Sequence, residues 1–305
     1  MSEVRLLPTG VEVSFDEVES TLARPRMEER KSAAGLALTA TIVVVGQAER
    51  LTEAAEALDQ LTDVGVLAVL ISYGANPAPK VRVTDQAVAL EALRPEFLNN
   101  AVAALRLSSL PTVVWWRGGD PATLDRLAEL SDRLILDVED PRPEWARAGA
   151  LLDRTAFSDL RWTRLTRWRA LMAHFFDIPE VRAAAPSFNR LRIEGSDIHA
   201  ARLYAAWLSS TLHWTRAVTV DLQERPGAAP LERVELGNDS QELTLDLAPS
   251  RTCVNTAACV HGHRGASRTV SIGDQGLAAL ISNELRIRSR DLAFERALAA
   301  VEGVV

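Results

Sequence analysis

The densest group of residues that could do chemistry is the run CVNTAACVHGH, from Cys253 to His263. Its two thiols, Cys253 and Cys259, and its two imidazoles, His261 and His263, are ligand types that zinc prefers. One residue separates the two histidines, which is tighter than the separation of about two to four residues common in zinc sites. The spacing therefore disfavours a metal site, and we favour a surface loop with incidental or redox-active thiols. A reversible disulfide between the cysteines is also permitted.

The turn from Gly118 to Pro121 is the best candidate for binding an anion. It follows a predicted strand and precedes a predicted helix, where free backbone amides can receive a phosphate. Aspartate is also a common helix cap and proline a common first helical residue, so a capped turn without a ligand is the commoner meaning of this pattern. One alternative is therefore that the protein is an enzyme of unrecognised type, which binds a phosphorylated ligand at the turn Gly118–Asp120.

Other catalytic and cofactor motifs do not occur in the sequence. The first buried strand is followed by Gly46-Gln47-Ala48, a single glycine where a dinucleotide fingerprint has three. Neither a P-loop lysine motif nor a Gly-x-Ser-x-Gly nucleophile turn is found. All five histidines lie after residue 173, and none has an obvious carboxylate partner. We therefore expect no catalytic residues, no cofactor and no bound metal, in a protein that is not an enzyme.

Tryptophan and arginine, the residue types most enriched in binding hot spots, gather at two places. Adjacent residues of a strand point to opposite sides, so at least one tryptophan of the pair Trp115-Trp116 must pack in the core or between domains. We predict that some members of the set are buried between the two domains and that the exposed remainder forms a partner-binding face. The seven residues are Trp115, Trp116, Arg117, Trp162, Arg164, Trp168 and Arg169.

The second of these places, Phe157–Asp177, has the pattern of an amphipathic helix. Ser158 or Asp159 would cap it, and Pro179 would end it. One apolar stripe follows three- and four-residue spacing through Leu165, Trp168, Met172 and Phe175. A buried helix with solvated arginines is the favoured interpretation, and a recognition surface is the sharper alternative.

Composition narrows the class of protein. The chain has 305 residues, a net charge of −7 and a pI near 5.4, which argue against a general nucleic-acid binder. Two cysteines make no disulfide framework, the first ten residues do not resemble a signal peptide, and no apolar run approaches the ~20 residues of a membrane span. We expect a cytoplasmic protein with no nucleic-acid or membrane partner.

The order of predicted elements indicates two domains after a lead-in strand and helix at residues 1–38. Strands alternate with helices between residues 39 and 140, the pattern of a Rossmann-like α/β domain with a parallel sheet, which we place at 39–150. The proline-rich segment 140–145 is the candidate boundary. A smaller α+β domain with a mainly antiparallel sheet is predicted for 151–305. Its expected strands are 188–193, 217–222, 231–236, 242–247 and 269–272, and its expected helices are 197–213 and 277–301.

Several blocks resemble the glucose-6-phosphate dehydrogenase assembly protein family, the OpcA proteins of cyanobacteria and actinobacteria. LPTVVWWRG at 110–118 and DLRWTRLTRWRALMAHFFD at 159–177 are the most specific blocks. ATIVVV, DRLILD, RIEGSDIHAARLYAAWLSSTL and ISNELRIRSRDLAFERAL support them at 40–45, 132–137, 192–212 and 281–298. The family has a His-Pro segment where this chain reads SYGANPAPKVR, so any role of that histidine cannot be carried over.

The resemblance implies a non-catalytic partner of glucose-6-phosphate dehydrogenase. Such a protein would act as an allosteric activator, favouring the active oligomer of the dehydrogenase in the oxidative pentose phosphate pathway. By mass action, a protein that binds only the assembled state shifts the equilibrium toward that state. Besides the enzyme with a phosphorylated ligand, a metal-dependent module built on the Cys/His run is the remaining alternative.

Overall fold

A computed structural model describes residues 6–18, 20–22, 37–76, 79–214, 218–260, 263–265, 267–287 and 289–304. The predicted lead-in helix, which follows Phe15 and ends at Lys31, lies outside these ranges from residue 23 onward, as do His261 and the side chain of His263. The chain forms two compact units. The first comprises Met1–Leu160 and Gly276–Arg290, and the second comprises Arg161–Gln275 and Asp291–Val305.

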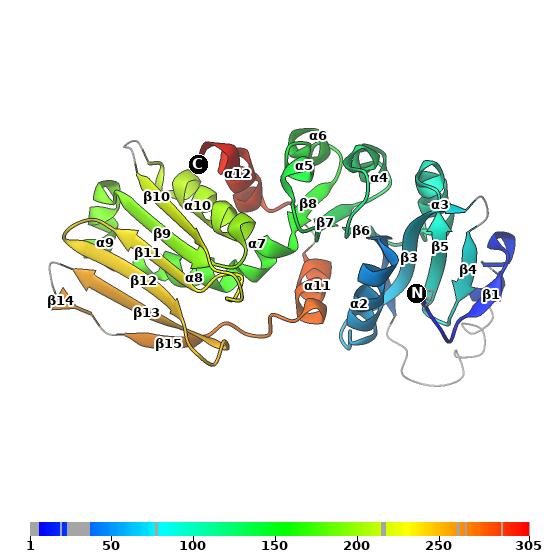
Figure 1. Ribbon diagram of the computed structural model, residues 1–305, viewed down its shortest axis with the longest axis horizontal. Coiled ribbons are helices and arrows are strands. Elements are labelled where there is room, and N and C mark those ends of the chain that lie inside the picture. The colour runs from blue at the N-terminus through cyan, green and yellow to red at the C-terminus, as the bar shows by residue number, and fades with distance from the viewer. Residues whose placement is uncertain are drawn as a thin grey trace. The chain divides into compact units, whose positions relative to one another are not determined.

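The first unit is built on an eight-stranded sheet with the strand order β1-β4-β5-β3-β2-β6-β7-β8 (Figure 1). The six strands from β5 to β8 in this order run parallel, and β4 and β1 continue the sheet antiparallel at one edge. The strands are β1 Val11–Val13, β2 Leu38–Gly46, β3 Gly65–Asn76, β4 Lys80–Val83, β5 Ala87–Leu93, β6 Thr112–Trp116, β7 Arg133–Leu136 and β8 Ala156–Asp159.

Helices connect consecutive parallel strands of this sheet, except that β4 lies between β3 and β5 in the chain. The sheet and its connections confirm the predicted Rossmann-like α/β architecture, which follows from apolar runs alternating with helical periodicity. The helices of the unit are η1 Phe15–Glu17, α2 Ala48–Asp59, η2 Pro95–Phe97, α3 Leu98–Leu105, η3 Pro121–Thr123, α4 Leu124–Ala128, α5 Arg142–Trp145, α6 Ala148–Leu152 and α11 Leu277–Arg286.

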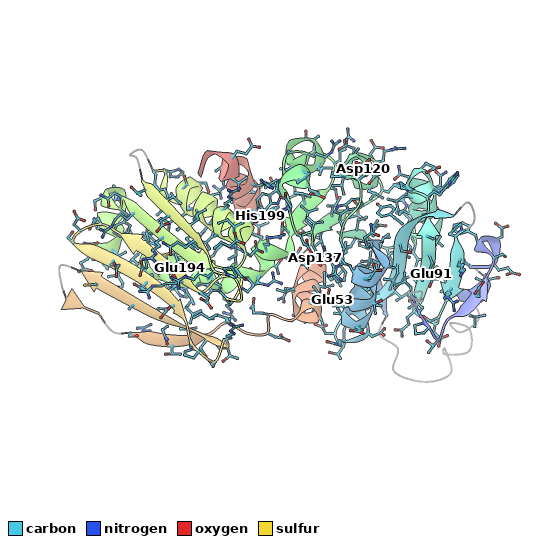
Figure 2. All side chains as sticks on the ribbon, viewed as in Figure 1. Glu53, Glu91, Asp120, Asp137, Glu194 and His199 are labelled. Carbon is cyan, nitrogen blue, oxygen red and sulfur yellow. The ribbon has the colours of Figure 1, made fainter. Side chains whose placement is uncertain are left out.

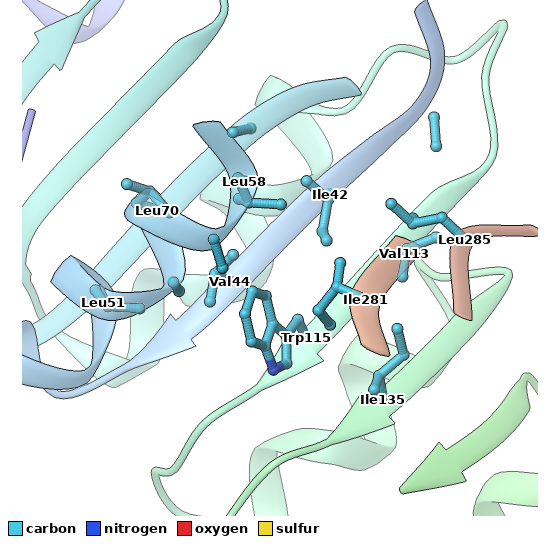
Figure 3. Close-up of a cluster of buried hydrophobic side chains, with 14 of the residues drawn as sticks. Ile42, Val44, Leu51, Leu58, Leu70, Val113, Trp115, Ile135, Ile281 and Leu285 are labelled. Carbon is cyan, nitrogen blue, oxygen red and sulfur yellow. The ribbon is translucent and has the colours of Figure 1, made fainter. Parts of the chain in front are cut away.

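One face of the sheet packs against α2 and α11. Alternate residues of the central strands, such as Val44 and Trp115, are fully buried there together with Leu51 of α2 (Figure 3). From α11, Ile281 and Leu285 complete the same cluster. A helix that is distant in sequence therefore supplies part of the core of the first unit.

Polar contacts also fix α11 in the first unit. The Glu284 carboxylate is 2% exposed, forms an ion pair with Arg133 at 3.2 Å, and accepts a hydrogen bond from Ser158 Oγ at 2.8 Å. Asp63 accepts a hydrogen bond from Ser282 and pairs with Arg286. Because a buried carboxylate is stable only with such partners, these contacts specify one position for α11.

The second unit is built on a seven-stranded sheet with the path β10-β9-β11-β12-β13-β14, and β15 also pairs with β13. Only the β10–β9 pair is parallel, so the sheet is mainly antiparallel, as predicted. The strands are β9 Arg190–Gly195, β10 Thr219–Glu224, β11 Arg233–Gly237, β12 Gln241–Leu247, β13 Cys253–Val260, β14 His263–Arg264 and β15 Arg268–Ser271. The helices are α7 Leu160–Arg164, α8 Thr166–Phe175, α9 Pro179–Ala184, η4 Ala185–Ser187, α10 Ile198–Leu212, α12 Leu292–Ala300 and η5 Val301–Val304.

The single helix predicted for Phe157–Asp177 is wrong. The segment begins as β8 and continues as α7 and α8, which are separated at Leu165. Asp159 ends β8 directly before the first residue of α7, and its carboxylate accepts a hydrogen bond from the Trp145 indole at 3.1 Å. Pro179 opens α9, as its fixed φ suits a first helical position. The apolar stripe is nevertheless buried, as the favoured interpretation requires.

Three further local predictions differ from the structure. The turn-rich sequence of Tyr73–Pro79 predicts a loop, but β3 extends into this segment as far as Asn76. The expected surface loop at the cysteines is β13, whose alternating burial marks a strand with one covered face. The expected closing helix at 277–301 is two helices, α11 in the first unit and α12 in the second. Consequently β8 and α11, both beyond residue 150, lie in the first unit, although the predicted boundary assigns them to the second domain.

Candidate functional site

The predicted site residues of the first unit are at the end of β6, and all three are buried. Trp115 and Trp116 are fully buried on opposite faces of the sheet. Trp115 packs in the core beside α2, whereas the Trp116 indole donates a hydrogen bond to Glu144 at 3.1 Å and packs edge-on against Tyr73. Both tryptophans therefore serve the core, and neither offers a surface within this unit.

Arg117 follows β6 at the topological switch point of the sheet. The chain leaves β2 toward β3 and leaves β6 toward β7, on opposite sides, so the carboxyl ends of β2 and β6 border the crevice where doubly wound folds bind ligands. Gly46, the last residue of β2, lies directly against Arg117, since a Cβ at Gly46 would be 3.1 Å from the Arg117 Cβ. The Arg117 side chain is only 3% exposed.

Internal partners hold the Arg117 guanidinium in place. It pairs with Glu53 of α2 at 2.6 Å and with Asp137 at 2.8 Å, and it donates to the carbonyl of Arg50. Figure 2 labels the two carboxylate residues, Glu53 and Asp137. Asp137 is also 3.7 Å from the Arg50 guanidinium. The crevice near the first turn of α2 therefore holds two cations and two carboxylates of the protein itself.

The turn after β6 is tightly packed. Gly119 has φ +143°, and a Cβ there would be 2.5 Å from the Tyr73 ring and 2.7 Å from the Trp116 ring. The Asp120 carboxylate accepts the amide of Ala122 at 2.9 Å, which is the helix-capping role. An anion at this turn would have to share the amide with a carboxylate, so the geometry suits a cap better than a phosphate site.

In the second unit, Trp162 and Arg169 form one packed cluster with Asp291. The Trp162 indole is 2% exposed and donates to Asp291 at 2.7 Å. The Arg169 guanidinium carbon lies 3.4 Å from the Trp162 ring centroid, a close cation–π contact. Burial lowers the pKa of Arg169 to about 10, so the guanidinium stays charged at neutral pH. This geometry indicates a structural role for both residues.

Arg164 and Trp168, by contrast, line a cavity of about 410 Å³ in the second unit. Trp168 is a buried wall of this cavity, and its backbone carbonyl accepts a hydrogen bond from the Tyr204 hydroxyl at 3.2 Å. Arg164 is half-buried and has no ion-pair or hydrogen-bond partner within the described ranges. Among the seven predicted residues, Arg164 therefore has the charge most open to an external partner, and the binding role of the set stays a prediction.

The two cysteines lie in one extended strand. Both are free thiols, lie six positions apart in β13 and face the same side, so their Cα atoms are about 20 Å apart. A disulfide needs a Cα separation below about 7 Å. The strand therefore excludes both the permitted internal disulfide and a shared metal ion for Cys253 and Cys259. No three His, Cys, Asp or Glu side chains in the described part of the chain are grouped as metal ligands would be.

The sequence analysis did not identify the acidic residues that pair with the arginines and tryptophans of these sites. Asp291 precedes the apolar run of α12 and could have been recognised as a helix cap. Glu53, Asp137 and Glu284 had no local signal, because each meets an arginine more than 15 residues away.

No helix within the described ranges has the length and apolar character needed to cross a bilayer.

Comparison with known proteins identifies the second half of the chain. Residues 155–298 match the family model that describes the C-terminal domain of the glucose-6-phosphate dehydrogenase subunit. A solved oxidoreductase from Sinorhizobium meliloti aligns with a TM-score of 0.55 and 11% identity, covering 88% of this chain and 96% of the other. At that identity, the match shows a likeness of fold alone.

Two relatives named "Putative OxPP cycle protein OpcA" extend the match. The protein from Synechocystis sp. is 25% identical over 69% of this chain and 53% of its own length. The protein from Nostoc punctiforme is 25% identical over 68% of this chain and 54% of its own length. The chain thus spans about half the length of these relatives. The domain model and both relatives confirm the predicted resemblance of this chain to the OpcA family.

Proposed function

We propose that the protein is a non-catalytic partner of glucose-6-phosphate dehydrogenase that favours the active oligomer of that enzyme in the oxidative pentose phosphate pathway. The observation that carries the proposal is the match of residues 155–298 to the domain model named for the dehydrogenase, which covers most of the second unit. The names of the two relatives place them in the same cycle. Binding only the assembled dehydrogenase is sufficient to raise its activity by mass action.

The switch point of the first unit supports a non-catalytic role. A dinucleotide in a doubly wound fold rests its pyrophosphate at this position, close to a helix N-terminus. Here Arg117, which is 3% exposed, and its carboxylates occupy the position, and moving the carboxylates away would leave the Arg117 guanidinium as an unpaired buried charge. Because an unpaired buried charge costs free energy, separating these ion pairs to make room for a ligand is unfavourable.

The experiment mixes the purified protein with its cognate dehydrogenase. We expect co-elution on size exclusion, a larger dehydrogenase oligomer and a higher activity in the same fractions. Unchanged oligomer size and activity, under both oxidising and reducing conditions, would contradict the proposal. A thermal-shift screen with nucleotides and sugar phosphates addresses the alternative enzyme, because a ligand at 100 times its Kd adds about 2.7 kcal/mol of stability.

Charge reversal at Arg164 locates the partner face. We expect Arg164→Glu to raise the Kd for the dehydrogenase about tenfold, which is about 1.4 kcal/mol. Arg126→Glu on α4 of the first unit is the control, since Arg126 is an exposed arginine that belongs to none of the predicted sites. Equal affinities of the two variants would show that Arg164 is not in the partner face. Arg169 is unsuitable for this test, because its reversal would break the contact with Trp162.

A further inference from the structure

The cavity beside Arg164 has the size of a small-molecule site. Its volume of about 410 Å³ falls within the range of roughly 300–1,000 Å³ typical of ligand pockets. All of its walls belong to the second unit: α7, the start of α8 and of α10, the loop before β11, the end of β12 and the segment after β15.

The walls of this cavity are mainly apolar. Leu165, Trp168, Leu231 and Ile272 line it, and each of these side chains is less than 7% exposed in the folded chain. They are core residues that present one side to the cavity. A rigid apolar surface of this kind binds a ring or a short chain by removing it from water.

Three arginines and no acidic residue line the same cavity: Arg161, Arg164 and Arg251. Asp197 compensates one of them, since it pairs with Arg161 at 2.8 Å. Arg164 has no described partner, and Arg251 makes one long hydrogen bond, 3.4 Å, to the carbonyl of Gly227. Arg164 is half-buried and Arg251 is exposed, and neither has a counter-ion among the described residues, so both guanidinium groups are available to an anionic ligand beside the apolar wall.

Arg251 lies in the turn that joins β12 and β13. Arg251 has φ +56°, the left-handed region that costs energy for any residue with a side chain other than a short polar one. A turn holds it there, with the Arg251 amide donating to the carbonyl of Ala248 at 2.8 Å. Strained residues of this kind gather at binding sites. The turn brings Arg251 to the cavity from an element different from that of Arg164.

We propose that this cavity binds a small organic anion. Its apolar ring or chain lies against Leu165, Trp168 and Leu231, and its carboxylate, phosphate or sulfonate group is bound by Arg164 and Arg251. The site shares Arg164 with the partner face proposed above, but binding of the anion does not require the dehydrogenase. Charge and shape are both required, so neither an inorganic anion nor a neutral aromatic compound alone binds as well.

The test uses two fluorescent probes that differ in charge. Anilinonaphthalene sulfonate carries an aromatic body with a sulfonate, and phenylnaphthylamine is the same body without the charge. With the full chain, we expect saturable binding of one sulfonate probe per chain and weaker binding of the neutral probe. Inorganic phosphate should displace the sulfonate probe and leave the neutral one bound, which requires no variant.

Variants then assign the arginines. Arg164→Gln combined with Arg251→Gln should raise the Kd of the sulfonate probe at least tenfold and leave that of the neutral probe unchanged. Arg167→Gln is the matched control, since Arg167 is exposed on α8 and does not line the cavity. Leu231→Trp, which fills the cavity, should abolish binding of both probes.

Several outcomes would overturn the proposal. One is that the double variant and the parent chain bind the sulfonate probe with equal affinity. Another is that Arg167→Gln weakens binding of this probe as much as the double variant does. Absence of saturable probe binding to the parent chain would also overturn it. None of these outcomes depends on whether the protein binds the dehydrogenase.

Discussion

At the scale of single residues, Asp291 stabilises two elements of the second unit with one carboxylate. Oδ1 accepts the amides of Ala293 and Phe294 at 3.0 Å each and so caps α12, while Oδ2 accepts the buried indole N–H of Trp162 at 2.7 Å. Asp291→Ala should lower the free energy of unfolding by about 2–4 kcal/mol, the sum of a lost cap and an unpaired buried donor.

Urea unfolding followed by far-UV circular dichroism measures this loss. Asp291→Asn retains one acceptor oxygen and should cost about half as much as the alanine variant. Asp239→Ala is the control, because the Asp239 side chain is 96% exposed and should change stability little. A stability of Asp291→Ala within about 0.5 kcal/mol of the parent chain would contradict the dual role.

The two tyrosines of the chain, Tyr73 and Tyr204, link stability to alkaline pH. Burial raises the pKa of both phenols above the ordinary value of about 10. The unfolded chain then loses these protons near pH 10 while the folded chain keeps them, so the folded state is destabilised as pH rises above about 10. Below that pH both states are protonated, and the phenols contribute no pH dependence.

Absorbance of tyrosinate at 295 nm checks this prediction, since both tyrosines contribute to the signal. In the native protein we expect no ionisation before the far-UV signal is lost, and in strong urea we expect titration at about pH 10. Tyr204→Phe should reduce the loss of stability by up to about 1.4 kcal/mol per pH unit above 10. Tyrosinate formation near pH 10 in a protein with native circular dichroism would refute it.

At the scale of elements, the turn after β6 offers a matched pair of substitutions. Gly118 and Gly119 both have positive φ, at +136° and +143°, so alanine costs backbone strain of about 1–3 kcal/mol at either position. Only Gly119 has aromatic rings where a Cβ would be, while Gly118 has nothing within 4 Å. Gly119→Ala should therefore be less stable than Gly118→Ala by about 2 kcal/mol.

Unfolding midpoints of the two variants, compared under the same conditions, test the turn. Tryptophan fluorescence should also change more in Gly119→Ala, because the clash falls on Trp116 and Tyr73. Equal stability of the two variants would show that the rings move aside at no cost, and the packing account of this turn would fail.

Elements were predictable from the sequence where burial on both faces made a continuous apolar run. β2, with ATIVVV at its centre, and β6 are such strands, and their parallel order follows from the helices between them. β4 and β13 were missed, because charged or small residues alternate in them and imitate a loop. β8 was missed because four residues, Ala156–Asp159, are too short to show a period.

The candidate site was less predictable than the fold. The sequence located the Trp/Arg-rich segments, but it could not separate Trp162, which is held by Asp291, from Arg164, which lines a cavity. The partner of Trp162, Asp291, lies 129 residues further along the chain, so no local pattern in the sequence shows their contact. Arg251 lies in a turn and has no local pattern at all, so only the folded second unit brings it to the same cavity as Arg164.

At the scale of the whole molecule, the two units interrupt each other along the chain. α11 belongs to the first unit and α12, five residues after it, to the second. We expect a fragment of residues 1–160 to lack a cooperative thermal transition, because Leu280, Ile281 and Leu285 would be missing from its core and Arg133 would lose Glu284. Adding residues 276–290 through a flexible linker should restore the transition.

Calorimetry of the two fragments measures this difference, with the full chain as reference. A cooperative transition of residues 1–160 alone, near that of the first unit in the full chain, would show that α11 is dispensable. A fragment cut at the family-model bounds, 155–298, should also be unstable, since it ends inside α12 and carries α11 without its partners.

The late position of α11 has a consequence for synthesis on the ribosome. All eight strands of the first sheet have been made by residue 160, but the helix that covers part of its core follows only at 277–286. At roughly 5–20 residues per second, the nascent sheet waits on the order of 10 s with that apolar face uncovered. Holding chaperones that bind exposed apolar surface would protect the chain during this interval. The yield of native protein should therefore depend on translation speed between β8 and α11.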